Sequence, residues 1–247
     1  MIEIRGVRKI LNAKRVLDGV DLEIREGETL VIMGPSGTGK SVLLKHIVGI
    51  MDPDEGDLRV DGVSVPHADG REIRKIRSKI SYVFQNSALF DSLSAAGNIR
   101  LGLPDRFCDD PAVDCEELIA QTLRQVNLEP EAMYLMPAEL SGGMQKRVAI
   151  ARAVVAKSKY ILYDEPTTGL DPVNAGVINR LIERLNHEIE STSVIVTHDV
   201  QSAFQLADRI ALLSGGKIRA QGSPEEMRAS ENELVREFLS PRAVGAA

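Results

Sequence analysis

One glycine-rich segment restricts the fold of this chain more than any other feature. Residues 34–41 read Gly-Pro-Ser-Gly-Thr-Gly-Lys-Ser, which matches the pattern G-x-x-x-x-G-K-[ST] at every fixed position. A short apolar run, Thr29–Met33, precedes the segment, and residues 40–50 follow it with apolar side chains at helical spacing. The order of strand, loop and helix predicts a phosphate-binding loop, because the start of a helix attracts anions.

The residue types in this loop suit a bound triphosphate. Gly37 and Gly39 carry no Cβ, so backbone N–H groups can approach phosphate oxygens closely. Lys40 is expected to reach the β- and γ-phosphates, and the Ser41 hydroxyl to bind Mg²⁺. The alternative is a glycine-rich turn that binds nothing, which the agreement of motif and context disfavours. The predicted nucleotide contacts are Gly34, Pro35, Ser36, Gly37, Thr38, Gly39, Lys40, Ser41 and Val42.

Strand and helix patterns alternate along most of the chain. Apolar runs predict strands at 160–164, 193–197 and 209–213, and residues 175–189 have the clearest helical period. This alternation predicts an α/β fold of P-loop NTPase type, in which helices flank a mixed sheet. The predicted parts are a nucleotide-binding core (1–87 and 156–222) with an N-terminal antiparallel β subdomain, an inserted α-helical subdomain (88–155) and a C-terminal helical tail (223–247).

Composition narrows the class of protein. The formal charge of −6 and the pI of about 5.4 argue against a nucleic-acid partner, since such proteins are usually basic. Cys108 and Cys115 are the only cysteines, so we expect no disulfide framework, two incidental cysteines and a reducing cytoplasm. We find no signal peptide and no apolar run of the roughly 18 residues that cross a bilayer. Any membrane role would therefore need another chain.

A pair of carboxylates follows one apolar strand. Residues 160–164 end in Asp164, and Glu165 comes next. Adjacent charges at the end of a buried strand need partners or a task. Asp164 suits a contact with Mg²⁺, and Glu165 can act as the general base for an attacking water. A solvated strand end is the alternative that the pair alone leaves open, and the phosphate loop favours the functional interpretation.

A second phosphate-binding pattern narrows the family. Residues 140–145 read Leu-Ser-Gly-Gly-Met-Gln, which closely resembles the LSGGQ signature of ATP-binding cassette (ABC) ATPases. Ser141 can cap a helix, and Gly142 and Gly143 expose backbone N–H groups. The resemblance implies a head-to-tail homodimer, in which each ATP lies between one phosphate loop and the signature of the partner. A small-molecule kinase would leave this second pattern unexplained.

Further motifs follow in the order that the family shows, over roughly residues 1–222. Gln85 resembles the Q-loop glutamine near Mg²⁺ and the attacking water, Asp171 the D-loop, and His198 the switch histidine at the γ-phosphate. The resemblance implies ATP and Mg²⁺ as ligands. It implies three sets: catalytic Glu165, His198, Gln85 and Lys40; metal-binding Ser41, Gln85 and Asp164; and nucleotide-binding Ser141, Gly142, Gly143 and Asp171.

The chain departs from the family on the adenine side. Most members stack adenine on an aromatic residue ahead of the phosphate loop, but this chain has no Phe or Tyr before Tyr82 and no Trp at all. Leu11, Arg15 and Val16 are the residues that we expect to cover the base instead. A second, milder departure is Met144, where the signature usually has Gln.

Within the family, three stretches resemble the ATPase of MCE-linked, Mla-type lipid transporters: 84–93, 98–99 and 135–144. This implies phospholipid transport, integral-membrane permease subunits, an MCE-domain lipid-binding protein and a peripheral place on the cytoplasmic face of the inner or plasma membrane. Leu89 and Phe90 are predicted to contact the permease or, alternatively, to pack inside the helical subdomain. An ABC importer or exporter for another substrate and a non-transport ABC ATPase are the functional alternatives.

Overall fold

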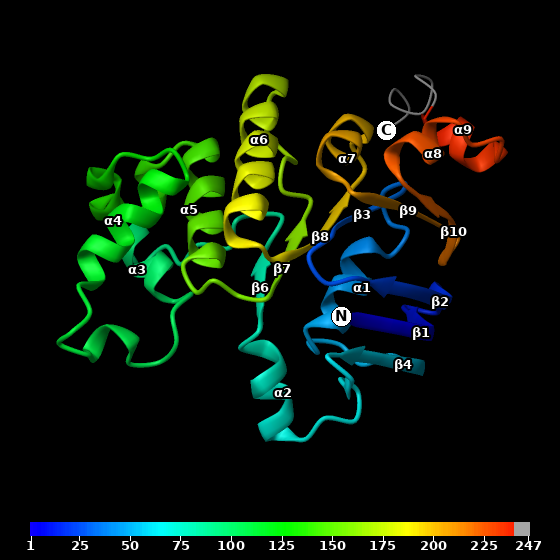
Figure 1. Ribbon diagram of the computed structural model, residues 1–247, viewed down its shortest axis with the longest axis horizontal. Helices are drawn as coiled ribbons and strands as arrows, with labels where there is room; N and C mark the ends of the chain where they lie inside the picture. The colour runs from blue at the N-terminus through cyan, green and yellow to red at the C-terminus, as the bar shows by residue number, and fades with distance from the viewer. Residues whose placement is uncertain (240–247) are drawn as a thin grey trace. The chain divides into compact units, whose positions relative to one another are not determined.

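The computed structural model describes residues 1–239 of the chain. It divides into two compact units (Figure 1): unit 1 comprises Met1–Arg77 and the chain from Thr192 on, and unit 2 comprises Ser78–Ser191. The predicted boundaries at 87, 155 and 222 do not coincide with the limits of these two units. The predicted division into functional regions stays a prediction. Residues 240–247 of the predicted tail lie outside the described residues.

Unit 1 contains the predicted antiparallel β subdomain. Its strand order is β2-β1-β4-β5, and all neighbours run antiparallel. Asn12 and Ala13, at φ 49° and 61°, form the two-residue turn of the β1–β2 hairpin, since both central residues of such a turn have positive φ. The strands are β1 Ile2–Leu11, β2 Lys14–Ile24, β4 Glu55–Val60 and β5 Val63–Ser64.

A second set of strands in unit 1 is mostly parallel. β3 (Thr29–Met33) pairs in parallel with β8 (Thr192–Thr197) and β9 (Arg209–Ser214), and β10 (Lys217–Gly222) pairs antiparallel with β9. Every residue of β3 and β8 is buried, which explains their uninterrupted apolar pattern in sequence. The helices of this unit are α1 Lys40–Ile47, α2 Gly70–Arg77, α7 Val200–Leu206, α8 Pro224–Arg228 and α9 Glu233–Leu239.

The C-terminal tail predicted to be helical contains two short helices, α8 and α9. The side chain of Asn232 accepts a hydrogen bond from the Leu234 N–H, so a new helix begins there instead of α8 continuing. Met227 and Val235 are buried. This segment therefore packs on its own unit.

Unit 2 combines two parallel strands with the four helices α3, α4, α5 and α6. β6 (Ile80–Val83) and β7 (Tyr160–Asp164) pair in register, and α3, α4 and α5 pack against one another (Figure 1). The helical character predicted for residues 86–155 is confirmed. The helices are α3 Ala95–Arg100, α4 Cys115–Gln125, α5 Gly142–Val154 and α6 Pro172–Ile189, with 3₁₀ turns at Phe107–Asp109, Pro130–Tyr134 and Pro137–Glu139.

The expectation that the two cysteines are incidental is wrong. Cys108 and Cys115 form a disulfide that joins a 3₁₀ turn to the first residue of α4. Their Cα atoms lie 5.4 Å apart, within the range that a disulfide spans. The number of cysteines alone does not predict this bond, because it depends on the conformation of the residues between Cys108 and Cys115.

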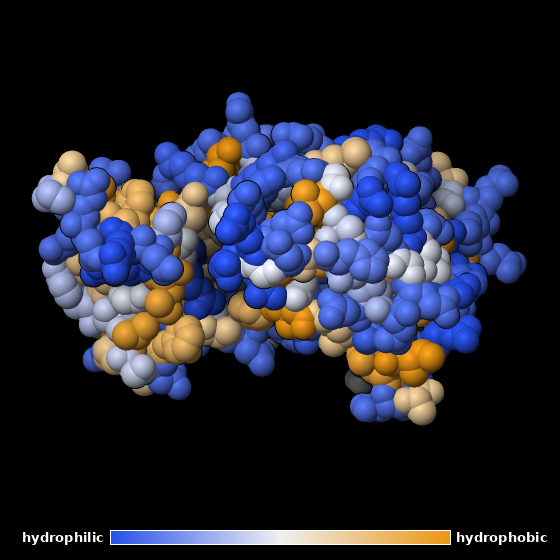
Figure 2. Space-filling model, turned by 90° about the horizontal axis from the view of Figure 1, so that it is seen from below, coloured by the Kyte–Doolittle hydropathy of each residue, from blue (hydrophilic) through white to orange (hydrophobic). Residues whose placement is uncertain are grey.

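Surface hydrophobic residues occur in small groups. Figure 2 shows one face of the molecule, on which hydrophilic residues predominate and hydrophobic ones form separate patches. No helix among residues 1–239 has the length and apolar character needed to cross a bilayer.

Candidate active site

The phosphate loop joins β3 to α1 in unit 1. Gly39 precedes α1 with φ 101°, and Lys40, only 5% exposed, begins the helix. The Lys40 ammonium folds back over the loop, where Nζ donates to the backbone oxygens of Gly34 at 2.8 Å and Pro35 at 3.1 Å. A buried cation, a helix N-terminus and the glycine residues of the loop fit a bound polyphosphate.

Two glycines of the loop differ sharply in the space around them. A Cβ at Gly34 would lie 2.2 Å from the carbonyl oxygen of Leu213, whereas a Cβ at Gly37 would meet nothing within 4 Å. Both residues have positive φ, 158° and 76°. Of these two glycines, only Gly34 is therefore required by packing.

We expect Gly34→Ala to destabilise the protein by about 1–3 kcal/mol, because the new methyl group forces the loop away from β9. Gly37→Ala, the matched control, should lose only the roughly 1 kcal/mol that an L-residue loses at positive φ. Urea unfolding of both variants measures the difference. Equal losses for the two variants would show that the contact with Leu213 does not constrain the loop.

His198 lies at the same sheet edge as the phosphate loop. β3 and β8 run parallel with Met33 opposite Thr197, so Gly34 and His198 each come next at the carboxyl end of their strand. His198 is exposed there, and the Thr197 hydroxyl accepts a hydrogen bond from the Asp199 N–H at 3.0 Å. The fold brings these two sequence-predicted elements together, as parallel strands do with their ends.

The residues predicted to cover adenine occupy the β1–β2 hairpin. Val16 lies against the phosphate loop, since a Cβ at Gly39 would be 2.9 Å from Val16 Cγ1. Arg15 is exposed and forms an ion pair with Asp18 at 3.0 Å, and half-buried Leu11 pairs with Lys14 beside the turn. The hairpin thus offers aliphatic and guanidinium surface, but no aromatic ring.

We expect this site to distinguish ATP from GTP by less than about a hundredfold, equivalent to about 2.7 kcal/mol. An aromatic stack contributes about 1–3 kcal/mol per base, and a guanidinium replaces only part of it. Competition binding with the two nucleotides provides the measurement. A preference for ATP above that limit would mean that other groups read the base, and Arg15→Ala would then leave the preference unchanged.

Unit 2 carries the predicted glutamine just after β6 and the two predicted carboxylates at the end of β7. Val83 lies opposite Tyr163 in this parallel pair, so Gln85 and Asp164 follow close to each other in register. Asp164 is 5% exposed and accepts a hydrogen bond from the Tyr82 hydroxyl at 2.9 Å. Burial, together with the Asp164 charge, raises the pKa of Tyr82, which keeps it a hydrogen-bond donor to this carboxylate.

Glu165 has an unusual backbone conformation. It is 7% exposed and has φ 48°, a left-handed value that strains a residue with a Cβ. The Thr168 N–H donates to the Glu165 backbone oxygen at 3.2 Å, and the Thr168 hydroxyl donates to Oε2 at 3.3 Å. Strain of this kind gathers at functional sites, where the surrounding structure holds it, which supports the functional role predicted for Glu165.

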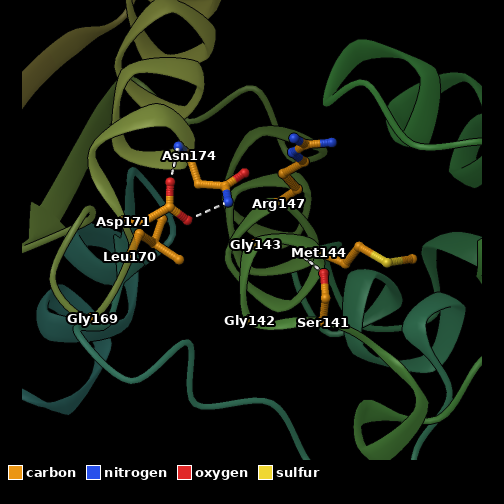
Figure 3. A pocket seen from close by; sticks show the side chains of 9 residues that line it. All are labelled: Ser141, Gly142, Gly143, Met144, Arg147, Gly169, Leu170, Asp171 and Asn174. Atoms are coloured by element: carbon orange, nitrogen blue, oxygen red, sulfur yellow. Dashed lines mark hydrogen bonds between the residues drawn. The ribbon is translucent and has the colours of Figure 1, made fainter.

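The signature and the D-loop line one pocket (Figure 3). The Ser141 hydroxyl caps α5 by accepting from the Met144 N–H at 3.3 Å, as the sequence predicts. Asp171 caps α6, and the Asn174 side-chain amide donates to Oδ2 at 2.6 Å, which lowers the pKa of Asp171. The lining residues are Ser141, Gly142, Gly143, Met144, Arg147, Gly169, Leu170, Asp171 and Asn174.

Sequence reasoning missed four polar residues at these sites. Tyr82 binds Asp164, Asn174 binds Asp171, Arg147 lines the signature pocket, and Lys146 donates to the backbone oxygen of Gln85. Arg147 and Asn174 lie within a few residues of recognised motifs, which is a usable signal. Tyr82 and Lys146 depend on contacts between distant parts of the sequence.

The predicted metal ligands provide a hydroxyl, an amide and one carboxylate. Ser41 belongs to unit 1, and Gln85 and Asp164 belong to unit 2. Residues 1–239 contain no group of three or more His, Cys, Asp or Glu side chains that could hold a metal. Hydroxyl, amide and carboxylate oxygens are donor types that suit Mg²⁺, which keeps several waters and binds substrate phosphates as well.

Comparison with known proteins agrees with this geometry. The family model described as ABC transporter matches residues 17–168, more than half of the chain. The chain belongs to the ABC transporter family. A solved dimer of an ATP-binding cassette in a post-hydrolysis state, bound to ADP and Pi, superimposes with a TM-score of 0.80 at 36% identity. The match covers 91% of this chain and 99% of that one.

Two curated relatives of this cassette align along nearly all of it. MlaF of Haemophilus influenzae, named an intermembrane phospholipid transport system ATP-binding protein, is 34% identical over 99% of this chain and 92% of its own length. A Mycobacterium leprae protein, mkl, named a probable ribonucleotide transport ATP-binding protein, is 35% identical over 99% and 70%. The predictions of a P-loop NTPase fold and of an ABC ATPase that uses ATP and Mg²⁺ are confirmed.

Proposed function

We propose that this ATPase is the motor subunit of a system that transports phospholipid between membranes. The observation that carries the proposal is the end-to-end match with MlaF of Haemophilus influenzae, which spans nearly the whole of both chains. The residues after Gln85 and before Ser141, which resemble Mla-type ATPases, support the same substrate class.

The working form proposed for the subunit is a head-to-tail homodimer. Gly142 is exposed, and a Cβ there would meet no atom within 4 Å, so the signature pocket opens to the outside of unit 2. Its exposed N–H groups form a second phosphate site besides the phosphate loop. One chain uses both sites only if they contact two different ATP molecules, each shared with a partner copy.

The residues then have distinct tasks in hydrolysis. Lys40 neutralises charge on the terminal phosphates, and Glu165 takes a proton from the attacking water as the general base. Gln85 and His198 orient the water and the γ-phosphate. Mg²⁺, when bound, offsets phosphate charge, and Ser41, Gln85 and Asp164 are the side chains that would hold it.

Contact with integral-membrane permease subunits is proposed for the loop after Gln85. Phe90 is 57% exposed and Leu89 is half-buried, which favours a partner contact for Phe90 over packing inside the helical subdomain. Asn98, fully buried, holds this loop in shape: Oδ1 accepts from the Phe90 N–H at 2.7 Å, and Nδ2 donates to the backbone oxygens of Phe90, Leu93 and Ser94.

The proposed location follows from that contact. A chain that binds permeases through this loop is peripheral, on the cytoplasmic face of the inner or plasma membrane. An MCE-domain lipid-binding protein is the further partner that the Mla-type resemblance implies.

Ribonucleotide transport is the second candidate, because mkl of Mycobacterium leprae is equally similar. The alignment covers 92% of the length of MlaF but 70% of the length of mkl, and this difference favours phospholipid transport. The test is to purify the tagged chain with its native permeases, reconstitute the complex in vesicles, and follow ATP-dependent movement of labelled phospholipid and of labelled ribonucleotide.

Phospholipid transfer that stops in the Glu165→Gln complex would support the proposal, and ribonucleotide uptake without lipid transfer would replace it. Phe90→Asp should prevent recovery of the permeases while the isolated chain keeps its ATPase rate. Asp91→Asn, an exposed neighbour, is the matched control and should leave recovery unchanged.

A further inference from the structure

Helix α5, which begins at the signature, is bonded to the segment that follows β6. Lys146 donates to the backbone oxygen of Gln85, and Arg152 donates to the backbone oxygens of Ser87 and Ala88, both at 2.7 Å. Two cations of a single helix therefore bind three carbonyls of the Q-loop segment. This segment has little regular structure of its own: Ser87 and Ala88 have φ of 60° and 45°.

Lys146 differs from Arg152 in its surroundings. It is 6% exposed, and burial lowers its pKa, while the negative charges of Asp164 and Glu165 act in the opposite direction. Lysine is almost never this buried without partners, and a buried ammonium is stable only when hydrogen bonds and opposite charge compensate it. The Gln85 carbonyl and the two carboxylates provide that compensation.

The charge of Lys146 thus lies where three recognised motifs converge. The Gln85 backbone is in direct contact with it, the two carboxylates are within electrostatic reach, and the capping residue Ser141 lies on the same helix. All of these residues belong to unit 2. No sequence motif singles out Lys146, since it lies beyond the last signature position.

We propose that Lys146 is a positioning residue for ATP hydrolysis, whose ammonium fixes the main chain at Gln85 relative to the carboxylates of Asp164 and Glu165. It acts through Gln85 and does not itself touch the reacting atoms. Loss of the ammonium leaves the Gln85 carbonyl without this donor and lets the segment 84–88 move, and small misplacements of catalytic groups lower rates strongly. The inference rests on the ATPase activity alone and is independent of the cargo.

Three substitutions separate the contributions of shape, hydrogen bonding and charge. Lys146→Met keeps an unbranched apolar stem but removes the ammonium, Lys146→Gln offers a neutral donor, and Lys146→Arg keeps both donor and charge. Lys157→Met, at an exposed lysine just after α5, is the matched control. Thermal unfolding of each variant confirms that it folds.

The expected kinetic result for Lys146→Met is a fall in kcat of about ten- to hundredfold with the dissociation constant for ATP changed by less than about twofold. Lys146→Arg should restore most of kcat, and Lys146→Gln should fall between the two. The control should match the wild type. If Lys146→Met does not fold, Lys146→Gln carries the comparison.

The second readout needs no nucleotide. The N–H groups of Ser87 and Ala88 donate within the segment, to the backbone oxygens of Phe84 and Asn86, so hydrogen exchange reports its mobility. We expect their exchange to rise about tenfold in Lys146→Met and to stay near wild type in Lys146→Arg. Unchanged exchange at 84–88, or parallel losses of kcat and of ATP affinity, would overturn the positioning role.

Discussion

Glu165→Gln is expected to lower the rate of ATP hydrolysis by about 10²- to 10⁴-fold and to leave ATP affinity within about twofold. The amide has almost the shape of the carboxylate but cannot accept the proton of the attacking water. The buried setting of Glu165 and its hydrogen bond from Thr168 hold the side chain in place, so the substitution changes chemistry rather than position. Phosphate release and equilibrium nucleotide binding measure the two quantities.

Two further observations sharpen this experiment. Glu188→Gln, at an exposed glutamate of α6 that pairs with Arg184 at the surface, is the control and should keep the wild-type rate, because surface pairs contribute little. The Glu165→Gln variant should also accumulate as an ATP-bound dimer on size-exclusion chromatography. Turnover near the wild-type rate would remove Glu165 from the role of general base.

Lys40→Ala should weaken ATP binding by about 10- to 100-fold, since hydrogen bonds from a charged donor contribute about 1.5–3 kcal/mol. The ammonium already lies over the loop, bonded to the Gly34 and Pro35 oxygens, so it contributes affinity without a large rearrangement. Isothermal titration with ATP and with ADP gives the two affinities. The loss should be larger for ATP, because the predicted contacts include the γ-phosphate.

Lys45→Ala, in the last turn of the same helix, is the matched control and should bind ATP normally. The unfolding midpoint of Lys40→Ala provides the second check. A weak ATP affinity together with an unchanged midpoint assigns the effect to the phosphate contact. An unchanged affinity would contradict the role given to Lys40.

The local parts of this fold could be predicted from the sequence. β3 and β7 have the predicted bounds, and α1 starts at Lys40 as expected, because glycine loops, apolar runs and caps act within a few residues. The phosphate loop and the signature could be predicted for the same reason, because each motif spans only a few consecutive residues.

The contacts that join the motifs could not be predicted in this way. Lys146 and Gln85 are 61 residues apart, and Tyr82 and Asp164 are 82 residues apart. Nothing in the periodicity of either segment indicates which side chain reaches the other, since that depends on how α5 packs beside β6. The Cys108–Cys115 disulfide could not be predicted for a related reason, because the conformation of the loop between the two cysteines decides whether the bond can form.

The buried Asn98 side chain holds the loop after Gln85 through its backbone and not through its exposed side chains. Its amide is hydrogen-bonded to the backbone of Phe90, Leu93 and Ser94, so this anchoring of the loop does not depend on the side chains of residues 89–92. We therefore expect the exposed side chains of this loop to be exchangeable while its backbone hydrogen bonds to Asn98 remain. Given the permease contact proposed for this loop, exchanging Leu89 and Phe90 while retaining Asn98 is expected to change which permease the ATPase binds, and natural divergence of partners has the same route open to it.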